Sequence, residues 1–226
     1  SITLTLYWQA GALLAEDAHV TVQGFIGDEQ VFILNAPPAS GTRHTKLWQP
    51  GEVIVDEWKI DLPADMPAPA LLRVDVGLFD PQTLVTWQAH DLSGNHVPGE
   101  ITRLRIQPER WSVYHGEHPL DFTFDDTIRL LGYDIDNSAG EFLNLTLYWE
   151  SLAPVSDDYT AFVHLLQPDG ALAAQSDVPP AYGQYPVSAW RPGEVDVDVV
   201  AQDADDEPVV KGTIRLWISE KPARSG

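Results

Sequence analysis

Apolar and polar residues alternate along most of the chain, which is the period of a β-strand with one buried face. In residues 2–8 every second residue is Ile, Leu or Trp, and the same alternation returns in residues 143–149. Runs rich in β-branched and aromatic residues, which favour strands, follow at 53–62, 71–79, 195–201 and 213–219. Because no stretch has the period of an amphipathic helix, the sequence predicts an all-β protein of short antiparallel strands.

Two motifs occur twice in the same order. Leu-Thr-Leu-Tyr-Trp at residues 4–8 returns at 145–149, an offset of 141, and Trp-x-Pro-Gly-Glu at 48–52 returns at 190–194, an offset of 142. A shared spacing of this kind predicts an internal duplication. We expect two tandem antiparallel β-sandwich domains of immunoglobulin-like or jelly-roll type, copy one at 1–108 and copy two at 109–226.

Each copy lacks strands that the other has. A strand predicted at 127–135 precedes copy two without a counterpart before copy one, and residues 84–87 and 101–106 have no counterpart after residue 219. We expect copy one to lack its first strand and copy two its last strands, because the sequence is cut from a longer polypeptide. The alternative is a strand swap, in which copy two or another molecule supplies the missing strand to an open sheet edge.

Charge and composition exclude several classes of partner. The chain has 34 acidic and 13 basic residues, a net charge of −21, and no cysteine. Nucleic acid and anionic lipid need clustered Lys and Arg, so we expect no nucleic-acid partner. No apolar run has the length of a membrane span, so we expect no direct membrane insertion. The absence of cysteine excludes disulfides, thiolate metal sites and cysteine nucleophiles.

Copy two carries a family resemblance at residues 162–170, 174–180, 183–186 and 190–194. These segments resemble a β-rich module at the C-terminal ends of large bacterial multi-pass membrane proteins, which are similar to glycosyltransferases of the dolichyl-phosphate-mannose type. The resemblance implies an extracytoplasmic accessory domain of a larger, membrane-anchored protein of the cell envelope. Its implied partners are the parent membrane domain or another envelope protein, and it implies no catalysis in this part of the chain.

The Trp-x-Pro-Gly-Glu motif has a structural interpretation. Pro sets the first central position of a type II turn and Gly supplies the positive φ of the second, so Pro50-Gly51 and Pro192-Gly193 are predicted to begin strands. Trp48 and Trp190 would then pack over the core. Stacking of a sugar on Trp190 is the alternative, because aromatic faces suit the apolar face of a pyranose.

Positions that differ between the copies are the candidate ligand site. Alternation and loop position predict an outward group of aromatic rings and one imidazole in copy two, formed by Phe162, His164, Tyr182 and Tyr185. Trp190 joins these four as a candidate ligand-binding residue through the sugar-stacking alternative. The candidate ligand is a glycan. Trp58 and Trp217 are also predicted to face outward. The sequence thus predicts a non-catalytic binding module, with a structural protein-interaction module as the alternative.

No catalytic residue can be assigned from motifs, because the chain contains no Gly-x-Ser-x-Gly, His-Glu-x-x-His or phosphate-binding loop. A glycoside hydrolase remains a weaker alternative, since any two carboxylates could be brought together by folding. No cofactor is expected except calcium, which acidic loops can bind. The candidate calcium ligands lie at Asp157-Asp158 and among Asp203, Asp205, Asp206 and Glu207.

Overall fold

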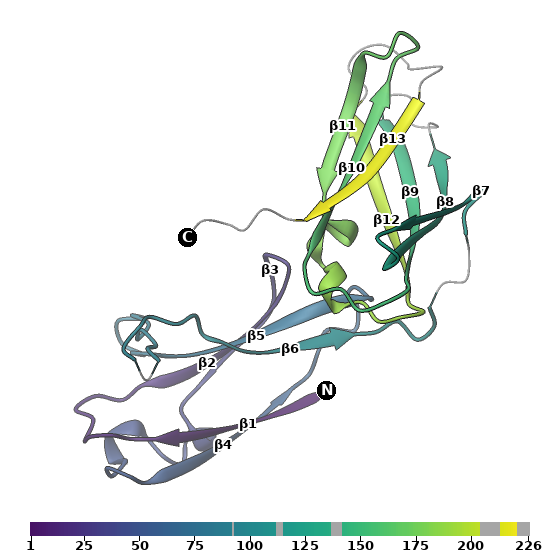
Figure 1. The fold of residues 1–226 in the computed structure, drawn as a ribbon. Helices are drawn as coiled ribbons and strands as arrows, with labels where there is room; N and C mark the ends of the chain where they lie inside the picture. The colour runs from purple at the N-terminus through teal and green to yellow at the C-terminus, as the bar shows by residue number, and fades with distance from the viewer. Residues whose placement is uncertain (92, 112–114, 137–141, 204–212, 221–226) are drawn as a thin grey trace. The chain divides into compact units, whose positions relative to one another are not determined.

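The computed structural model describes residues 1–91, 93–111, 115–136, 142–203 and 213–220, with the backbone alone at 142–143, 196–203 and 213–220. It is all-β, with antiparallel strands joined by loops and by 3₁₀ turns of three or four residues (Figure 1). Contacts divide the chain into two compact units. Unit 1 comprises Ser1–Pro67 and Leu72–Leu104, and unit 2 comprises Ala68–Leu71 and Arg105–Gly226.

The first part of the chain forms a two-stranded and a four-stranded sheet, in the orders β1-β4 and β3-β2-β5-β6. Two 3₁₀ turns, η1 (Ala39–Gly41) and η2 (Thr45–Leu47), precede β4. The strands are β1 (Ile2–Gln9), β2 (His19–Ile26), β3 (Glu29–Ala36), β4 (Val53–Ile60), β5 (Ala70–Phe79) and β6 (Glu100–Ile106).

The second part forms a four-stranded and a three-stranded sheet, in the orders β12-β9-β8-β7 and β11-β10-β13. Two 3₁₀ turns, η3 (Pro180–Gly183) and η4 (Val187–Ala189), precede β12. The strands are β7 (His118–Phe124), β8 (Ile128–Asp136), β9 (Phe142–Ser151), β10 (Tyr159–Leu166), β11 (Leu172–Val178), β12 (Val195–Asp203) and β13 (Thr213–Glu220).

The elements of the two units follow each other in the same order. β1, β2, β3, two 3₁₀ turns, β4 and β5 match β9, β10, β11, two 3₁₀ turns, β12 and β13. The pairings match too, because β1 pairs with β4 as β9 pairs with β12, and β2 lies between β3 and β5 as β10 lies between β11 and β13. The units differ at the edges, since β9 also pairs with β8 and β5 also pairs with β6.

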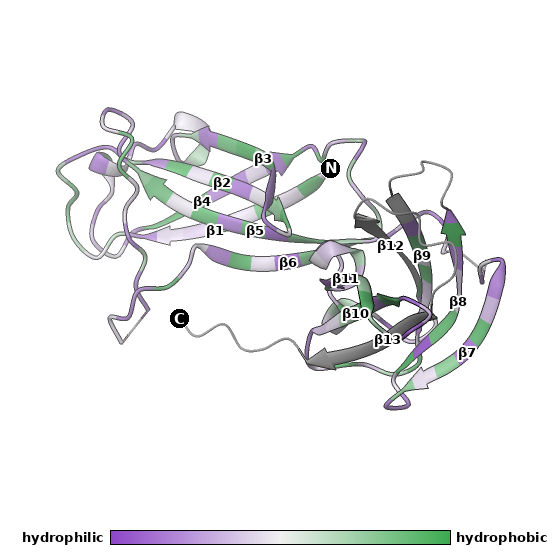
Figure 2. Ribbon diagram, turned by 90° about the horizontal axis from the view of Figure 1, so that it is seen from above, coloured by the Kyte–Doolittle hydropathy of each residue, from purple (hydrophilic) through white to green (hydrophobic). Residues whose placement is uncertain are grey.

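The cores follow from the alternation of apolar residues along the strands (Figure 2). Along β4 every second residue is buried, beginning with Ile54 and ending with Ile60. On β2 and β10 the alternating residues Val20, Val22, Ala161 and Val163 are buried. Trp58 was predicted to face outward, and this is wrong, because it shares the buried face of β4 with Ile54 and Ile60.

Within the described ranges, no helix is long and apolar enough to cross a lipid bilayer.

Candidate functional site

Two of the five predicted ligand-binding residues belong to the core of unit 2. Tyr185 is 1% exposed and Trp190 is buried, and both lie in the same apolar cluster as Leu147 and Trp149. The indole N–H of Trp190 donates to the carbonyl of Tyr185 at 3.0 Å. The prediction that Tyr185 points outward is therefore wrong, whereas the packing interpretation of Trp190 agrees with its burial.

The other three residues remain partly accessible. Phe162 and His164 are half-buried on β10, where they alternate with the buried core residues Ala161 and Val163. His164 Nε2 lies 3.7 Å from Asp177 Oδ1 on the neighbouring strand β11. Tyr182 is 56% exposed in η3. The five residues are thus divided between the core and the accessible side of unit 2 and do not form one surface.

Tyr185 is buried because its hydroxyl has polar partners inside unit 2. The hydroxyl donates to Glu194 Oε2 at 2.6 Å and accepts from Arg105 Nη2 at 2.5 Å, and Arg105 also forms an ion pair with Glu194. The Trp111 ring lies 6.2 Å from the Tyr185 ring. A buried tyrosine needs such a partner, and here the partners form a closed triad of Arg105, Tyr185 and Glu194.

The triad shifts two pKa values. Burial and, next, the hydrogen bond to Glu194 together raise the pKa of Tyr185 to about 12, against the opposing effect of Arg105. Burial by itself would lower the pKa of Arg105, but hydrogen bonds to Tyr185 and Glu194 outweigh it and the pKa is raised. Arg105 therefore stays charged and Tyr185 stays protonated at neutral pH.

Unit 1 has a simpler version of the same arrangement. Arg43 occupies the position equivalent to Tyr185, and its guanidinium pairs directly with Glu52, the counterpart of Glu194. The Trp48 indole donates to the carbonyl of Arg43 at 3.0 Å, as Trp190 does to Tyr185. The glutamate of the motif therefore pairs with an arginine in both units, but the arginine comes from a different part of the chain in each.

The turns themselves agree with the sequence-based prediction. Gly51 and Gly193 have φ values of +82° and +87°, and the N–H of each following glutamate bonds to the carbonyl three residues earlier at 3.0 Å. Each glutamate side chain also accepts from a backbone N–H of its own turn, Glu52 from Gln49 at 3.1 Å and Glu194 from Arg191 at 2.9 Å. The glutamate of each motif therefore serves its own turn as well as its basic partner.

An accessible hollow lies instead in unit 1, beside the loop of residues 80–99 between β5 and β6. The loop first folds back on β5, because Asp80 accepts from Thr83 Oγ1 at 2.6 Å and from the N–H of Gln82 at 2.8 Å. The hydrogen bond from Thr83 is the main cause that lowers the pKa of Asp80. The N–H of Trp87 then donates to Leu78 on β5 at 2.8 Å, which holds Trp87 beside the sheet.

The second half of the loop is closed by another aspartate. Asp91 accepts from Asn95, through side chain and backbone, and from the N–H of Ser93, and these bonds lower the pKa of Asp91. Just before β6 the loop lies close against β5. The N–H of Val76 donates to the carbonyl of Gly99 at 2.7 Å, and a Cβ on Gly99 would lie 2.7 Å from the carbonyl oxygen of Val76. Gly99 is thus required where the loop packs on β5.

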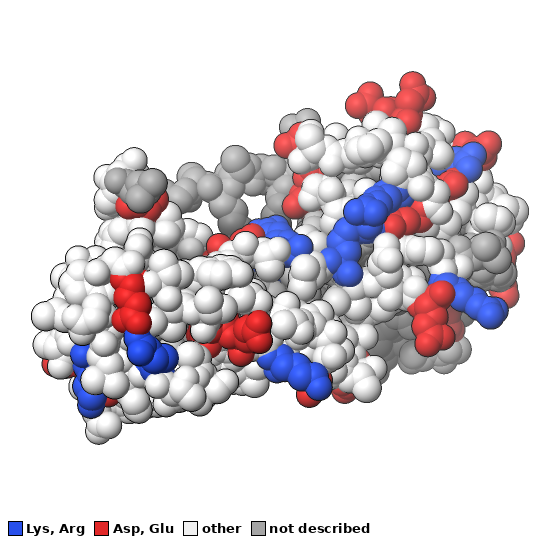
Figure 3. All heavy atoms as spheres, turned by 90° about the horizontal axis from the view of Figure 1, so that it is seen from below, with Lys and Arg blue, Asp and Glu red and all other residues white. Residues whose placement is uncertain are grey.

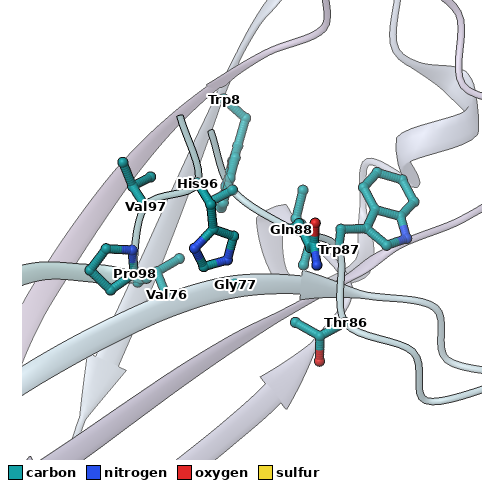
Figure 4. A pocket seen from close by; sticks show the side chains of 12 residues that line it. Trp8, Val76, Gly77, Thr86, Trp87, Gln88, His96, Val97 and Pro98 are labelled. Atoms are coloured by element: carbon teal, nitrogen blue, oxygen red, sulfur yellow. The ribbon is translucent and has the colours of Figure 1, made fainter. Parts of the chain in front are cut away.

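The hollow is a groove of about 530 Å³, lined by aromatic, aliphatic and a few polar side chains. Trp87 lies at one end of the labelled group and Pro98 at the other, with Trp8, His96 and Gln88 between them (Figure 4). A second hollow of about 320 Å³ shares Trp8 and Pro98 and extends along β1 to Leu6. We name the two together the Trp8 groove.

The Trp8 groove has the composition of a site for an uncharged, partly apolar ligand. Trp8 and Trp87 offer ring faces, while Gln88 and His96 offer an amide and an imidazole for hydrogen bonding. The indole N–H of Trp8 is already bonded to Asp56 Oδ2 at 3.1 Å, which fixes the orientation of the ring. The groove can therefore bind by stacking and hydrogen bonding, and it carries no assigned catalytic pair.

Charged groups on the face drawn in Figure 3 do not form a continuous basic surface. Lys and Arg side chains there are separated by uncharged areas, and several touch Asp or Glu. Among the described residues no group of three or more His, Asp or Glu side chains is placed to hold a metal ion. The side chains of Asp203, Asp205, Asp206, Glu207 and Trp217, named in the sequence analysis, lie outside the described residues.

No protein-family model matches the chain, and no curated protein matches it either.

Sequence reasoning missed the Trp8 groove for a physical reason. Trp8 alternates with Leu4 and Leu6 and was assigned to the core, and Trp87 and His96 lie in a loop without periodicity. The one indication in the sequence was that residues 84–87 have no counterpart in copy two.

Proposed function

We propose that this chain is a non-catalytic, extracytoplasmic accessory module of a larger envelope protein and that it binds a neutral glycan in the Trp8 groove. The observation that carries the proposal is that Trp87, the Gln88 amide and the His96 imidazole line one open groove. Sugars present an apolar ring face and a rim of hydroxyls, which suit stacking and hydrogen bonding respectively. The net charge of −21 favours a neutral ligand over an anionic polymer.

The architecture we propose is two β-sandwich domains of immunoglobulin-like type that arose by duplication. Support comes from the shared order of elements, from the matching strand pairs and from the two turns built alike around Glu52 and Glu194. The resemblance of copy two to envelope-protein modules supports the extracytoplasmic location. A parent membrane domain or another envelope protein is the proposed partner.

The test is calorimetric titration of the chain with neutral oligosaccharides selected on a glycan array. Trp87→Ala is expected to weaken binding at least about tenfold, because it removes one stacking face at a cost of about 1.4 kcal/mol or more. Leu84→Ala is the matched control, since Leu84 is exposed in the same loop and does not line the groove. Failure to bind any neutral glycan would contradict the proposal.

A third variant separates the groove from the site predicted by sequence. Tyr182→Ala removes the most exposed residue of that site in unit 2 and is expected to leave glycan binding unchanged. Loss of binding in Tyr182→Ala with full binding in Trp87→Ala would move the site to unit 2. Titration with added calcium and with chelator tests whether the acidic residues contribute an ion.

A further inference from the structure

The same five residues have different environments in the two units. In unit 2, Leu145, Leu147 and Trp149 of β9 are buried and Tyr148 is 7% exposed. In unit 1, the equivalent residues of β1 are only half-buried, and Tyr7 is 70% exposed. Because the sequences are identical, the difference lies in what covers them.

In unit 2 strand β8 is part of the cover, because its residues Ile128 and Leu130 belong to the same buried cluster as Leu145, Leu147 and Trp149. It pairs with β9 in antiparallel register, with Leu130 opposite Trp149 and Asp134 opposite Thr146. The hydroxyl of Tyr148 donates to Asp134 Oδ2 at 2.8 Å, so β8 provides a polar partner for the tyrosine as well as apolar cover. Among the strands that the structure describes, β1 pairs with β4 alone.

The Trp8 groove lies where an equivalent of β8 would pair with β1. Its β1 half is lined by Leu6, Tyr7 and Trp8, and the opposite side includes Gly99 and Ile101, whereas no residue of β4 lines it. Strand β6 contributes Glu100 and Ile101 to that opposite side. The groove is therefore open on the edge of β1 that β4 does not cover.

We propose that this edge of β1 accepts one added β-strand in antiparallel orientation, with the chemistry of β8. The occupant carries an apolar residue opposite Trp8 and a carboxylate for the Tyr7 hydroxyl, as Leu130 and Asp134 do in unit 2. Its backbone would complete the hydrogen bonding of an exposed strand edge, which is the mode of β-strand addition. The strand would cover the Trp8 end of the groove and leave the Trp87 end accessible.

The experiment adds the occupant to the full chain. A copy of residues 127–141 is placed before residue 1, since this segment directly precedes β9 in the sequence. Hydrogen exchange of the backbone amides of residues 2–9 is expected to slow at least tenfold, while β9, already paired on both edges, is unchanged. The control carries Asp at the positions of Leu130 and Gly132 in the added segment and is expected to give no protection.

A second pair of variants tests whether the added strand lies in the groove. Ile101 lines it and is 47% exposed, and Ile33 on β3, the opposite edge of the same sheet, is 50% exposed. In the extended chain, Ile101→Asp is expected to reverse the protection of β1, because a charge would be buried against the strand. Ile33→Asp is expected to leave the protection intact.

Three results would overturn the inference. The first is unchanged exchange of residues 2–9 on adding the segment. The second is equal loss of protection in Ile101→Asp and Ile33→Asp, which would place the strand elsewhere. The third is a dimer of the original chain, seen by light scattering, whose β1 amides are already protected, because the occupant would then be a second copy of the chain.

Discussion

Glu52 and Glu194 occupy the same place in the same turn, yet their charges are balanced differently. Glu52 pairs with Arg43, nine residues away, at side-chain exposures of 31% and 42%. Glu194 pairs with Arg105, 89 residues away, at exposures of 10% and 17%, with Tyr185 between them. The difference shows that the turn requires a glutamate for its own backbone, whereas the partner of that glutamate is free to change.

The change of partner also changes how much the ion pair contributes to the free energy of unfolding. Arg43 can form hydrogen bonds with water as well as with Glu52, so the ion pair adds little. Arg105 and Glu194 are largely removed from water, so each depends on the other and on the hydroxyl of Tyr185. We therefore expect equivalent substitutions in the two units to differ several-fold in their effect on stability.

The largest expected effect comes from the two glutamates. Glu194→Ala leaves a guanidinium that is only 17% exposed without its carboxylate and should lower the free energy of unfolding of unit 2 by about 3–5 kcal/mol. Glu52→Ala should cost unit 1 about 1 kcal/mol or less. Hydrogen exchange resolved by segment is the measurement, since two units need not unfold together. Equal losses of unfolding free energy in the two units would contradict the expected difference between Glu194 and Glu52.

The second effect depends on pH. Because the pKa of Tyr185 is raised from 10.0 to about 12 in the folded protein, its contribution to stability is fully present below pH 10 and is lost as the pH rises through 12. Two pKa units correspond to about 2–3 kcal/mol. Urea unfolding between pH 9 and 12 should show this loss, and Tyr185→Phe should show a correspondingly smaller one. A parallel decline in both proteins would contradict the assignment.

The smallest expected effect is the difference between Tyr148 and Tyr7, which occupy equivalent positions in the two units. Tyr148→Phe removes the hydrogen bond to Asp134 and should cost unit 2 about 1 kcal/mol. Tyr7→Phe should leave unit 1 unchanged, because Tyr7 is largely exposed. Urea unfolding of both variants is the measurement. In the chain with residues 127–141 added, the cost of Tyr7→Phe should rise toward that of Tyr148→Phe.

Much of the local structure could be predicted from the sequence, because alternation and turn chemistry are local properties. The strands around residues 2–8 and 143–149 and the positive φ of Gly51 and Gly193 follow from their own residues. The sequence also indicated that the strand before copy two, at 127–135, has no counterpart before copy one. β1 accordingly pairs on one edge only among the described strands.

The environments of single side chains could not be predicted in the same way. Tyr185 lies in a loop rich in turn-formers and was expected outside, but the partner that buries it is Arg105, which no local pattern connects to it. Trp58 was assigned to the wrong face because the phase of β4 depends on Ile54 and Asp56 facing the core. The Trp8 groove depends on which strand edge is uncovered, and this is a property of the sheet.

The separation between Arg105 and Glu194 also bears on when each unit can be completed during synthesis. Arg43 and Glu52 are nine residues apart, so both emerge from the ribosome at nearly the same time. Arg105 and Glu194 are 89 residues apart, so Arg105 emerges long before Glu194 is synthesised. Closing a loop of 89 residues rather than nine costs about 2 kcal/mol more chain entropy. We therefore expect the turn of unit 1 to form early on the nascent chain, while Arg105 stays solvated until the turn of unit 2 emerges.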